Sequence, residues 1–194
     1  MALAKKYEVK PVGTMAHEFI MCVGQGHHEL NPAYSNRFMM EAWTSEYGVE
    51  NGIALTDTLG TDLFLRDFDK RFATLFNGVR HDSGDPYMWG AKMLDHYNKL
   101  GIDATTKTLL FSDSLDFDRA RKLAHFFGSR AKVAFGIGTY LANPSPVKLN
   151  IVMKVVKCNG GPVAKLSDTP GKGMCEDEEY VNYLGRAIDW RLNH

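Results

Sequence analysis

The sequence has no excess of charge of either sign and no long apolar run. Its 194 residues contain 23 Lys plus Arg and 23 Asp plus Glu, so the formal net charge is zero. A general nucleic-acid-binding protein usually carries a basic excess, which disfavours that class. No apolar run approaches the length of a membrane-spanning helix, and the first eleven residues, MALAKKYEVKP, lack the apolar core of a signal peptide. We therefore expect a protein without membrane or nucleic-acid partners.

Cysteine is also scarce, and its number and spacing argue against a disulfide framework and against a structural metal bound by cysteines. The three cysteines, Cys22, Cys158 and Cys175, are scattered and odd in number. No metal-ligand spacing links them, so we expect reduced thiols in a cytoplasmic protein and no structural metal. The length is sufficient for one domain, or one domain with an appendage, to bury a core without such support.

Short apolar strands alternate with helices through the middle of the chain. Strands are expected at 53–56, 78–80, 107–112 and 131–138, and helices at 60–76, 85–100 and 116–127. A repeat of strand and helix every 25 to 30 residues, roughly, is typical of βαβ units. The fold class is therefore predicted to be α/β with a parallel sheet.

The two ends of the chain depart from this alternation. A helix is expected over 31–47, with an apolar stripe of Tyr34, Phe38, Ala42 and Trp43. Residues 149–167 read as two strands around an NGG turn, which predicts a β-hairpin. A last helix is expected over 176–191.

Polar residues and glycines follow the predicted strands. Asp57, Asp82, Asp113 and Gly136 each stand at the C-terminal end of one strand. Parallel sheets build their ligand sites from that edge, so these residues predict one shared site. The alternative is structural, because Asp, Ser and Gly also cap helices and form turns in any βα loop.

Two of these loops predict particular ligands. Arg80, in the motif RHDSGDP, has a planar guanidinium suited to a carboxylate or phosphate, or it pairs with Asp82 or Asp85 for structure alone. The loop FGIGT, next to the SDS of residues 112–114, suggests backbone N–H groups that cradle a phosphate, although a strand that ends in glycines can simply turn.

The stretch GTMAHE at 13–18 contains a histidine near a predicted helix start. Thr14 is expected to cap that helix, which places His17 in the first turn with Glu18 beside it. The helix dipole there mildly disfavours an imidazolium and favours an anionic adduct. Taken alone, a polar surface histidine is the simpler interpretation.

Six motifs together resemble one known family. GTMAHE, GIALTDT, GVRHDSGDP, KTLLFSDSLD, FGIGTYL and PVAKLSDTPGK occur in this order in nicotinate phosphoribosyltransferases. The resemblance runs from about residue 11 to the end and implies the C-terminal half of such an enzyme. It implies a partial, irregular α/β barrel of the type II phosphoribosyltransferase fold in residues 1–147. Residues 148–194 would form a hairpin and helix that return to an N-terminal α/β region.

The resemblance also implies a reaction. Nicotinate and phosphoribosyl pyrophosphate give nicotinate mononucleotide and pyrophosphate, with Mg²⁺ and with ATP hydrolysis coupled through a phosphohistidine, in the salvage route to NAD. The family enzyme is a homodimer with a shared active site. Upstream segments supply an aromatic partner for the pyridine ring and basic residues for the phosphates, so this chain alone is expected to be a weak, self-associating catalyst.

Residue by residue, the resemblance assigns His17 as the phosphorylated histidine, Asp57 as the carboxylate that orients it, and Glu18 as a further catalytic residue. Arg80 would meet the nicotinate carboxylate and Asp82 the ribose hydroxyls. The remaining substrate-binding residues implied are Ser83, Ser112, Asp113, Gly136, Gly138 and Thr139; no metal ligand is implied. Two alternatives stay open: a non-catalytic barrel fragment that binds phosphoribosyl ligands or complements a partner chain, and a preference for nicotinamide.

Overall fold

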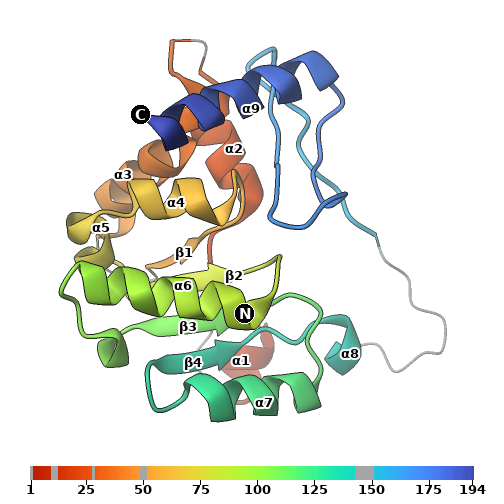
Figure 1. The fold of residues 1–194 in the computed structure, drawn as a ribbon. Helices are drawn as coiled ribbons and strands as arrows, with labels where there is room; N and C mark the ends of the chain where they lie inside the picture. Colours follow the sequence, from red (N-terminus) through yellow and green to blue (C-terminus); the bar gives the residue numbers. More distant parts are fainter. Residues whose placement is uncertain (1, 10–12, 28, 49–51, 143–150) are drawn as a thin grey trace.

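A four-stranded parallel sheet forms the centre of the molecule (Figure 1). The computed structural model describes residues 2–9, 13–27, 29–48, 52–142 and 151–194. The strand order is β1-β2-β3-β4, and neighbouring strands are in register, with Ala54 beside Val79 and Leu109 beside Val133. This confirms the predicted parallel sheet. The strands are β1 (Ile53–Leu55), β2 (Gly78–His81), β3 (Thr108–Phe111) and β4 (Lys132–Phe135).

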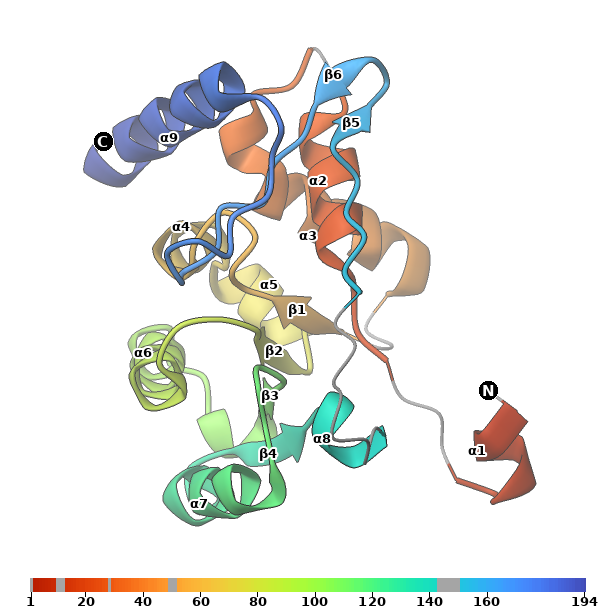
Figure 2. The same ribbon diagram turned by 90° about the vertical axis from the view of Figure 1, so that its right-hand side faces the viewer.

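Two helices lie along one side of this sheet (Figure 2). They are α6 (Pro86–Lys99) and α7 (Phe117–Phe127). Both begin at an aspartate N-cap: Asp85 accepts a hydrogen bond from the backbone N–H of Met88, and Asp116 from that of Arg119. Their apolar faces bury Trp89 and Phe127 against the sheet in the main core.

The single helix expected over 60–76 is wrong in one respect, because the chain forms two helices there. They are α4 (Thr61–Asp67) and α5 (Lys70–Leu75). The side chain of Asp69 accepts a hydrogen bond from Phe72 N and so starts a new helix in the middle of the segment. The predicted apolar face is confirmed and fully buried: Leu63, Phe64, Phe68, Phe72 and Phe76.

The N-terminal helices pack on each other at the β1 end of the sheet. They are α2 (His17–Gln25) and α3 (Ser35–Tyr47), and the short 3₁₀ turn η1 (Pro32–Tyr34) precedes α3. The apolar stripe predicted for the helix over 31–47 is only half-buried, so the expected stripe is not the buried face of α3. Because α2 approaches closely where Gly24 faces Ser35, the buried face carries smaller and unbranched side chains: Ser35, Asn36, Met39 and Met40.

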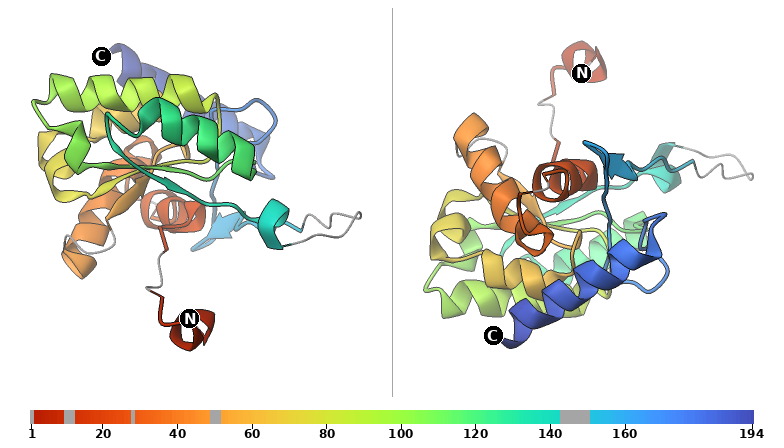
Figure 3. Two further views of the ribbon diagram at one scale, coloured as in Figure 1. Left: turned by 90° about the horizontal axis from the view of Figure 1, so that it is seen from below. Right: turned by 90° about the horizontal axis from the view of Figure 1, so that it is seen from above.

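The C-terminal part returns to the N-terminal helices (Figure 3). The predicted hairpin is present but short, with β5 (Lys157–Cys158) and β6 (Gly161–Pro162) around a turn in which Asn159 and Gly160 have positive φ. Residues 149 and 150 of the predicted hairpin lie outside the described residues. Helix α9 (Glu178–Asn193) covers a second, smaller core that contains Leu63 of α4.

The remaining elements are short. They are α1 (Ala2–Lys6), the 3₁₀ turn η2 (Ala104–Thr106) and α8 (Thr139–Ala142). Among the described ranges, no helix combines the length and the apolar character that crossing a bilayer requires. The three cysteines are unpaired thiols, as expected.

Candidate functional site

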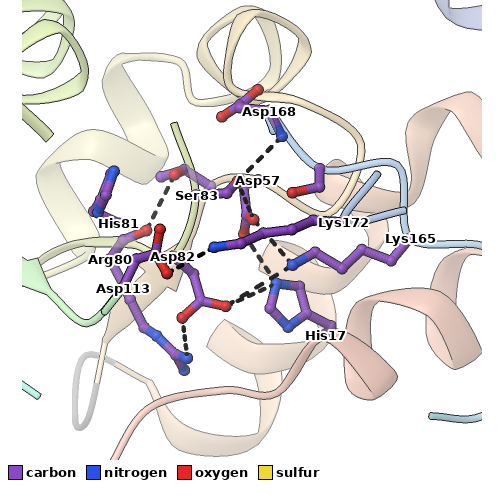
Figure 4. Close-up of polar contacts among 12 residues, drawn as sticks. His17, Asp57, Arg80, His81, Asp82, Ser83, Asp113, Lys165, Asp168 and Lys172 are labelled. Carbon is purple, nitrogen blue, oxygen red and sulfur yellow. Dashed lines mark hydrogen bonds and ion pairs between the residues drawn. The ribbon is translucent and has the colours of Figure 1, made fainter. Parts of the chain in front are cut away.

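The predicted site residues meet at the C-terminal edge of the sheet (Figure 4). Asp57 follows β1, Asp82 follows β2 and Asp113 follows β3. Since the strands are parallel, their carboxyl ends bring these side chains to the same edge. Helix α2 and the segment after the β5–β6 hairpin add further residues from the two ends of the chain.

His17 is the first residue of α2 and points into this cluster. It is 4% exposed, and its Nε2 lies 2.9 Å from Asp57 Oδ1 and 3.5 Å from Asp82 Oδ2. The interpretation as a surface histidine is therefore wrong. The predicted cap by Thr14 is also wrong: Ala16 stands at the N-cap position without a side-chain hydrogen bond, and Thr14 Oγ1 accepts a hydrogen bond from Arg80.

Asp57 is the most deeply held carboxylate of the cluster. Burial by itself raises its pKa, but His17, a hydrogen bond from Ser83 and the charge of Lys165 together hold the pKa of Asp57 well below its usual range. Ser83 Oγ donates to Asp57 Oδ2 at 2.6 Å. Asp57 is thus ionised, and an ionised carboxylate only accepts hydrogen bonds, so Nε2 of His17 carries the proton.

Lys165 belongs to the cluster, although sequence reasoning missed it. It is 6% exposed, and its Nζ lies 3.1 Å from Asp57 Oδ2 and 3.9 Å from Asp82 Oδ2. It therefore contacts the same two carboxylates as His17. The residue stands in the motif PVAKLSDTPGK, where a single lysine has no distinctive local pattern; only the motif as a whole gave a signal.

Arg80 is engaged by the protein on all three of its nitrogens. Nη2 pairs with Asp82 Oδ1 at 2.9 Å, Nε donates to Ser112 Oγ at 2.8 Å and Nη1 donates to Thr14 Oγ1 at 2.8 Å. The structural pairing with Asp82 is thus present, while Asp85 caps α6 instead. A ligand carboxylate that takes both outer nitrogens has to replace two of these partners.

Two other residues of the RHDSGDP loop, His81 and Ser83, are buried. His81 packs against Trp89 and Phe111 and donates a hydrogen bond to the carbonyl of Gly84; burial lowers the pKa of His81 and favours the neutral ring. Ser83 is 1% exposed and also accepts from the backbone N–H of Asp168. Ser83 therefore positions Asp57 and is not open to a ligand from this side.

The third and fourth strand ends are more open. Asp113 pairs with Lys172 at 2.7 Å, which places the segment 166–172 across the edge of the sheet. Gly136 N–H donates to the carbonyl of Phe111, so the sheet already uses this amide, which departs from the predicted phosphate cradle. Gly138 is exposed with open space beside it, and Thr139 begins α8.

Glu18 is the predicted site residue that the structure does not join to this cluster. Its carboxylate forms an ion pair with Lys154 at 3.1 Å, and within the described ranges no hydrogen bond links it to Asp57 or Asp82. A cavity of about 270 Å³ adjoins Ser83. It is lined by Thr61, Ser83, Gly84, Asp85, Met88, Trp89, Lys92 and Asp168, so it shares Ser83 with the predicted site residues but does not include His17, Asp57 or Asp82.

The cluster contains one arrangement of possible metal ligands. Ligand atoms of His17, Asp57 and Asp82 lie within 4.8 Å of one another. However, the ammonium of Lys165 already contacts both carboxylates, and Mg²⁺ prefers an octahedral shell of oxygens with several waters. These residues as folded do not fit a dedicated magnesium site.

Chemically, the cluster holds an imidazole with one nitrogen fixed. The Nε2 proton points to Asp57, and among the described residues no hydrogen bond involves Nδ1. A buried carboxylate on one nitrogen fixes the tautomer and stabilises positive charge that develops on the ring, as in catalytic triads. The arrangement therefore suits a histidine that acts as a nucleophile or base through Nδ1.

Comparisons with known proteins identify the family and the fold. The family model described as the nicotinate phosphoribosyltransferase (NAPRTase) family matches residues 1–190. A nicotinate phosphoribosyltransferase of Photorhabdus laumondii is 53% identical over 191 residues, which are 96% of this chain and 46% of the relative. Crystal structures of nicotinate phosphoribosyltransferases are also similar. The one from Vibrio cholerae has a TM-score of 0.92 at 43% identity, and the one from Porphyromonas gingivalis has a TM-score of 0.84 at 38% identity.

The structural matches cover 97% and 95% of this chain, but only 46% and 50% of those two proteins. The chain thus spans about half the length of the relatives it matches. Its mixed α/β fold with a four-stranded parallel sheet is that of the solved structures. Because the family model matches nearly the whole chain, the chain belongs to the nicotinate phosphoribosyltransferase family.

Proposed function

We propose that this chain provides the phosphohistidine and much of the substrate site of a nicotinate phosphoribosyltransferase. The enzyme would form nicotinate mononucleotide and pyrophosphate from nicotinate and phosphoribosyl pyrophosphate, in NAD salvage in the cytoplasm. The observation that carries this proposal is the buried His17, held through Nε2 between two aspartates at the edge of a parallel sheet. A buried histidine with a purely structural role would not require two carboxylates beside the same ring nitrogen, so this arrangement favours a role in the chemistry.

His17 would accept the γ-phosphoryl group of ATP on Nδ1. The Nδ1–P bond forms as the bond from the γ-phosphorus to the bridging oxygen breaks, and ADP leaves. The ring then carries a positive charge, which the ionised Asp57 stabilises across the 2.9 Å hydrogen bond. Ser83 holds that carboxylate in place. Mg²⁺, when bound, would neutralise phosphate oxygens of the substrates; we derive no protein ligand for it.

The substrate residues follow from the charges at the open part of the edge. Asp82, at 21% side-chain exposure, would bind the ribose hydroxyls, and Arg80 the nicotinate carboxylate once its present partners are replaced. Ser112, Asp113 and Gly138 would contact the ribose phosphate, with Gly136 supporting the turn and Thr139 following it. Glu18 would act only indirectly, since its partner is Lys154.

A second function is favoured by exposed apolar side chains. Ile151, Val152 and Met153 are 81%, 64% and 87% exposed, and Tyr140 and Leu141 are 64% and 59% exposed. Such side chains suit an interface with another polypeptide. The alternative function is therefore a non-catalytic fragment that binds phosphoribosyl ligands or complements a partner chain. Under the first proposal, the same surface would contact the rest of a homodimeric enzyme with a type II barrel.

The division of the chain into a barrel part, 1–147, and a C-terminal hairpin and helix, 148–194, remains part of this proposal. The second core lies between the two parts, because Ala164, Leu184 and Ile188 of the C-terminal part pack with Ala33, Leu59 and Leu63 of the first part. The boundary between 147 and 148 lies outside the described residues.

Two measurements test the proposed function. The purified chain is incubated with γ-labelled ATP and Mg²⁺, and protein-bound phosphate that is labile in acid is counted; the product assay follows nicotinate mononucleotide with and without ATP. Label is expected in the wild type and in His125→Ala, whose histidine is exposed on α7, but not in His17→Ala. Label that persists in His17→Ala would contradict the assignment. Product that appears only after a relative's N-terminal half is added would favour the complementing fragment.

A further inference from the structure

The β5–β6 hairpin packs against the C-terminal end of α2 (Figure 2). In the turn of the hairpin, the side chain of Asn159 donates a hydrogen bond to the carbonyl of Gly26 at 2.8 Å. After β6, Ala164 exchanges two hydrogen bonds with the side-chain amide of Gln25, at 2.8 and 2.6 Å. The backbone on both sides of the hairpin is thus attached to the same helix end, which fixes the position of Cys158 in β5 relative to α2.

The sulfur of Cys158 lies directly against this helix end. A Cβ atom at Gly26 would lie 2.5 Å from Cys158 Sγ and 3.0 Å from Cys158 Cβ, so the thiol approaches this closely only because residue 26 has no side chain. The backbone N–H of Gly26 donates to the carbonyl of Cys22 at 3.1 Å. Cys22 therefore stands one helical turn before Gly26, on the same face of the helix as the sulfur of Cys158.

Cys22 and Cys158 are half-buried free thiols that interact with each other. Burial, the neighbouring Cys158 and the charge of Glu18 raise the pKa of the Cys22 thiol to about 11, so Cys22 keeps its proton at neutral pH. The third cysteine has different surroundings, because the sulfur of Cys175 forms hydrogen bonds with the backbone of Asp177 before α9. Two of the three thiols are thus held side by side by the fold.

We propose that Cys22 and Cys158 are a redox-sensitive pair that a hydroperoxide converts into a disulfide within the chain. The thiolate of Cys158 attacks one peroxide oxygen; the S–O bond forms as the O–O bond breaks, which gives a sulfenic acid and hydroxide. This hydroxide takes up the proton that Cys158 had released. The sulfur of Cys22 then attacks the sulfur of Cys158; the S–S bond forms, the S–O bond breaks, and the departing hydroxide takes the thiol proton of Cys22. Two thiols together lose two electrons, and one hydrogen peroxide becomes two waters.

The bond would join the two ends of the chain. Helix α2 begins with His17, and the segment after the hairpin carries Lys165, so oxidation would tie together covalently the two segments that meet at Asp57. The thiols themselves lie at the other end of α2 from His17. The inference is therefore independent of the proposed function, and it concerns a modification site and not the phosphoryl-transfer chemistry.

The test uses the whole chain, reduced, freed of reductant and treated at neutral pH with one equivalent of hydrogen peroxide. Thiols are counted in denaturant, and peptides are mapped by mass spectrometry without reductant. The thiols should fall from three to one, and a linked peptide pair should contain Cys22 and Cys158. Dithiothreitol should restore all three thiols. The oxidised chain should unfold at a higher urea concentration than the reduced chain, because the bond closes a long loop.

The matched control is Cys175→Ser, which should form the same disulfide and retain no free thiol. Cys22→Ser removes the second thiol of the pair, so the sulfenic acid at Cys158 should persist and be captured by dimedone. Cys158→Ser should form no disulfide. In the wild type unfolded in urea, all three pairings should appear, because the fold no longer selects one.

Four results overturn the proposal. They are three thiols that survive the peroxide, a main product that includes Cys175 or links two chains, the same single pairing in the unfolded chain, and an oxidised chain that unfolds at lower urea than the reduced one. If a serine variant does not fold, the peptide map of the wild type decides alone. None of these measurements needs ATP or nicotinate, so their failure leaves the proposed function standing.

Discussion

Replacing Gly24 by alanine would move His17, because this glycine allows α2 to lie close to α3. A Cβ atom at residue 24 would lie 2.2 Å from Ser35 Cβ and 2.3 Å from Ser35 Cα. Contacting carbon atoms stay about 3.5 to 4.0 Å apart, so the helices must separate by roughly 1 Å or more. The Cα atom cannot rotate away, and therefore α2, with His17 at its start, has to shift.

The magnitude follows from two opposing effects. Overpacking of this kind costs about 1 to 3 kcal/mol, while alanine in place of glycine in a helix gains up to about 1 kcal/mol. We expect a net loss of up to about 3 kcal/mol in the free energy of unfolding. Because the His17–Asp57 contact is 2.9 Å, a shift of this size breaks it, and misplacement by about 1 Å can cost a reaction on the order of 100-fold.

Two matched glycines separate the causes. Gly185 in α9 has nothing within 4 Å, so Gly185→Ala should stabilise the chain by up to about 1 kcal/mol. Gly90 in α6 faces the ring of Phe127 at 2.4 Å, so Gly90→Ala should lose stability but leave His17 in place. Urea unfolding gives the stabilities, and the NMR signals of the His17 ring report its position. A Gly24→Ala variant with wild-type stability and unchanged His17 signals would refute the reasoning.

Three further outcomes are expected. Arg80→Lys keeps the charge but loses the planar fork, so nicotinate affinity measured by calorimetry should fall about tenfold or more, from a loss of about 1.5 to 3 kcal/mol; an equal loss for phosphoribosyl pyrophosphate would assign Arg80 to the phosphates or the fold. Arg191 Nη2 lies 2.6 Å from Oδ1 of the buried Asp67, so Arg191→Met leaves that carboxylate unpaired and should lower the free energy of unfolding in urea by about 3 to 5 kcal/mol. The double variant Asp67→Leu/Arg191→Met should recover part of this loss, and a single variant as stable as the double would contradict the reasoning. The pKa of Asp57 is lower in the folded chain, so its contribution to stability is complete above about pH 4 and is lost below it; Asp57→Asn should flatten that part of the acid unfolding curve, and an unchanged slope would refute the shift.

The sheet and the gathering of polar residues at one of its edges could be predicted because local patterns determine them. Each strand is a short apolar run followed by an aspartate or a glycine, and Asp85 and Asp116 cap the following helices. The break between α4 and α5 was missed because the apolar spacing continues across it. One side-chain cap, at Asp69, was enough to override that periodicity.

The sequence predicted that Asp57, Asp82 and Asp113 would lie at one edge of the sheet, but it did not predict the contacts that surround them. Thr14 looks like a helix cap in the sequence, yet its hydroxyl accepts from Arg80, which is distant in the chain. Lys165 lies in an extended segment far from Asp57, and no rule of spacing connects them. The family resemblance supplied the roles, whereas the counter-charges of the two aspartates required the structure.

The cluster also constrains the order in which this chain can fold. Asp57 contacts both His17 and Lys165, and its contact with Lys165 brings together two segments that lie far apart in the chain. Such contacts form late, because the entropy of closing long loops must first be offset. While the chain is being synthesised, β1 to β4 are available before the segment with Lys165 emerges. His17 therefore stays hydrated until the segment with Lys165 packs beside Asp57, and the cluster is complete only after that step.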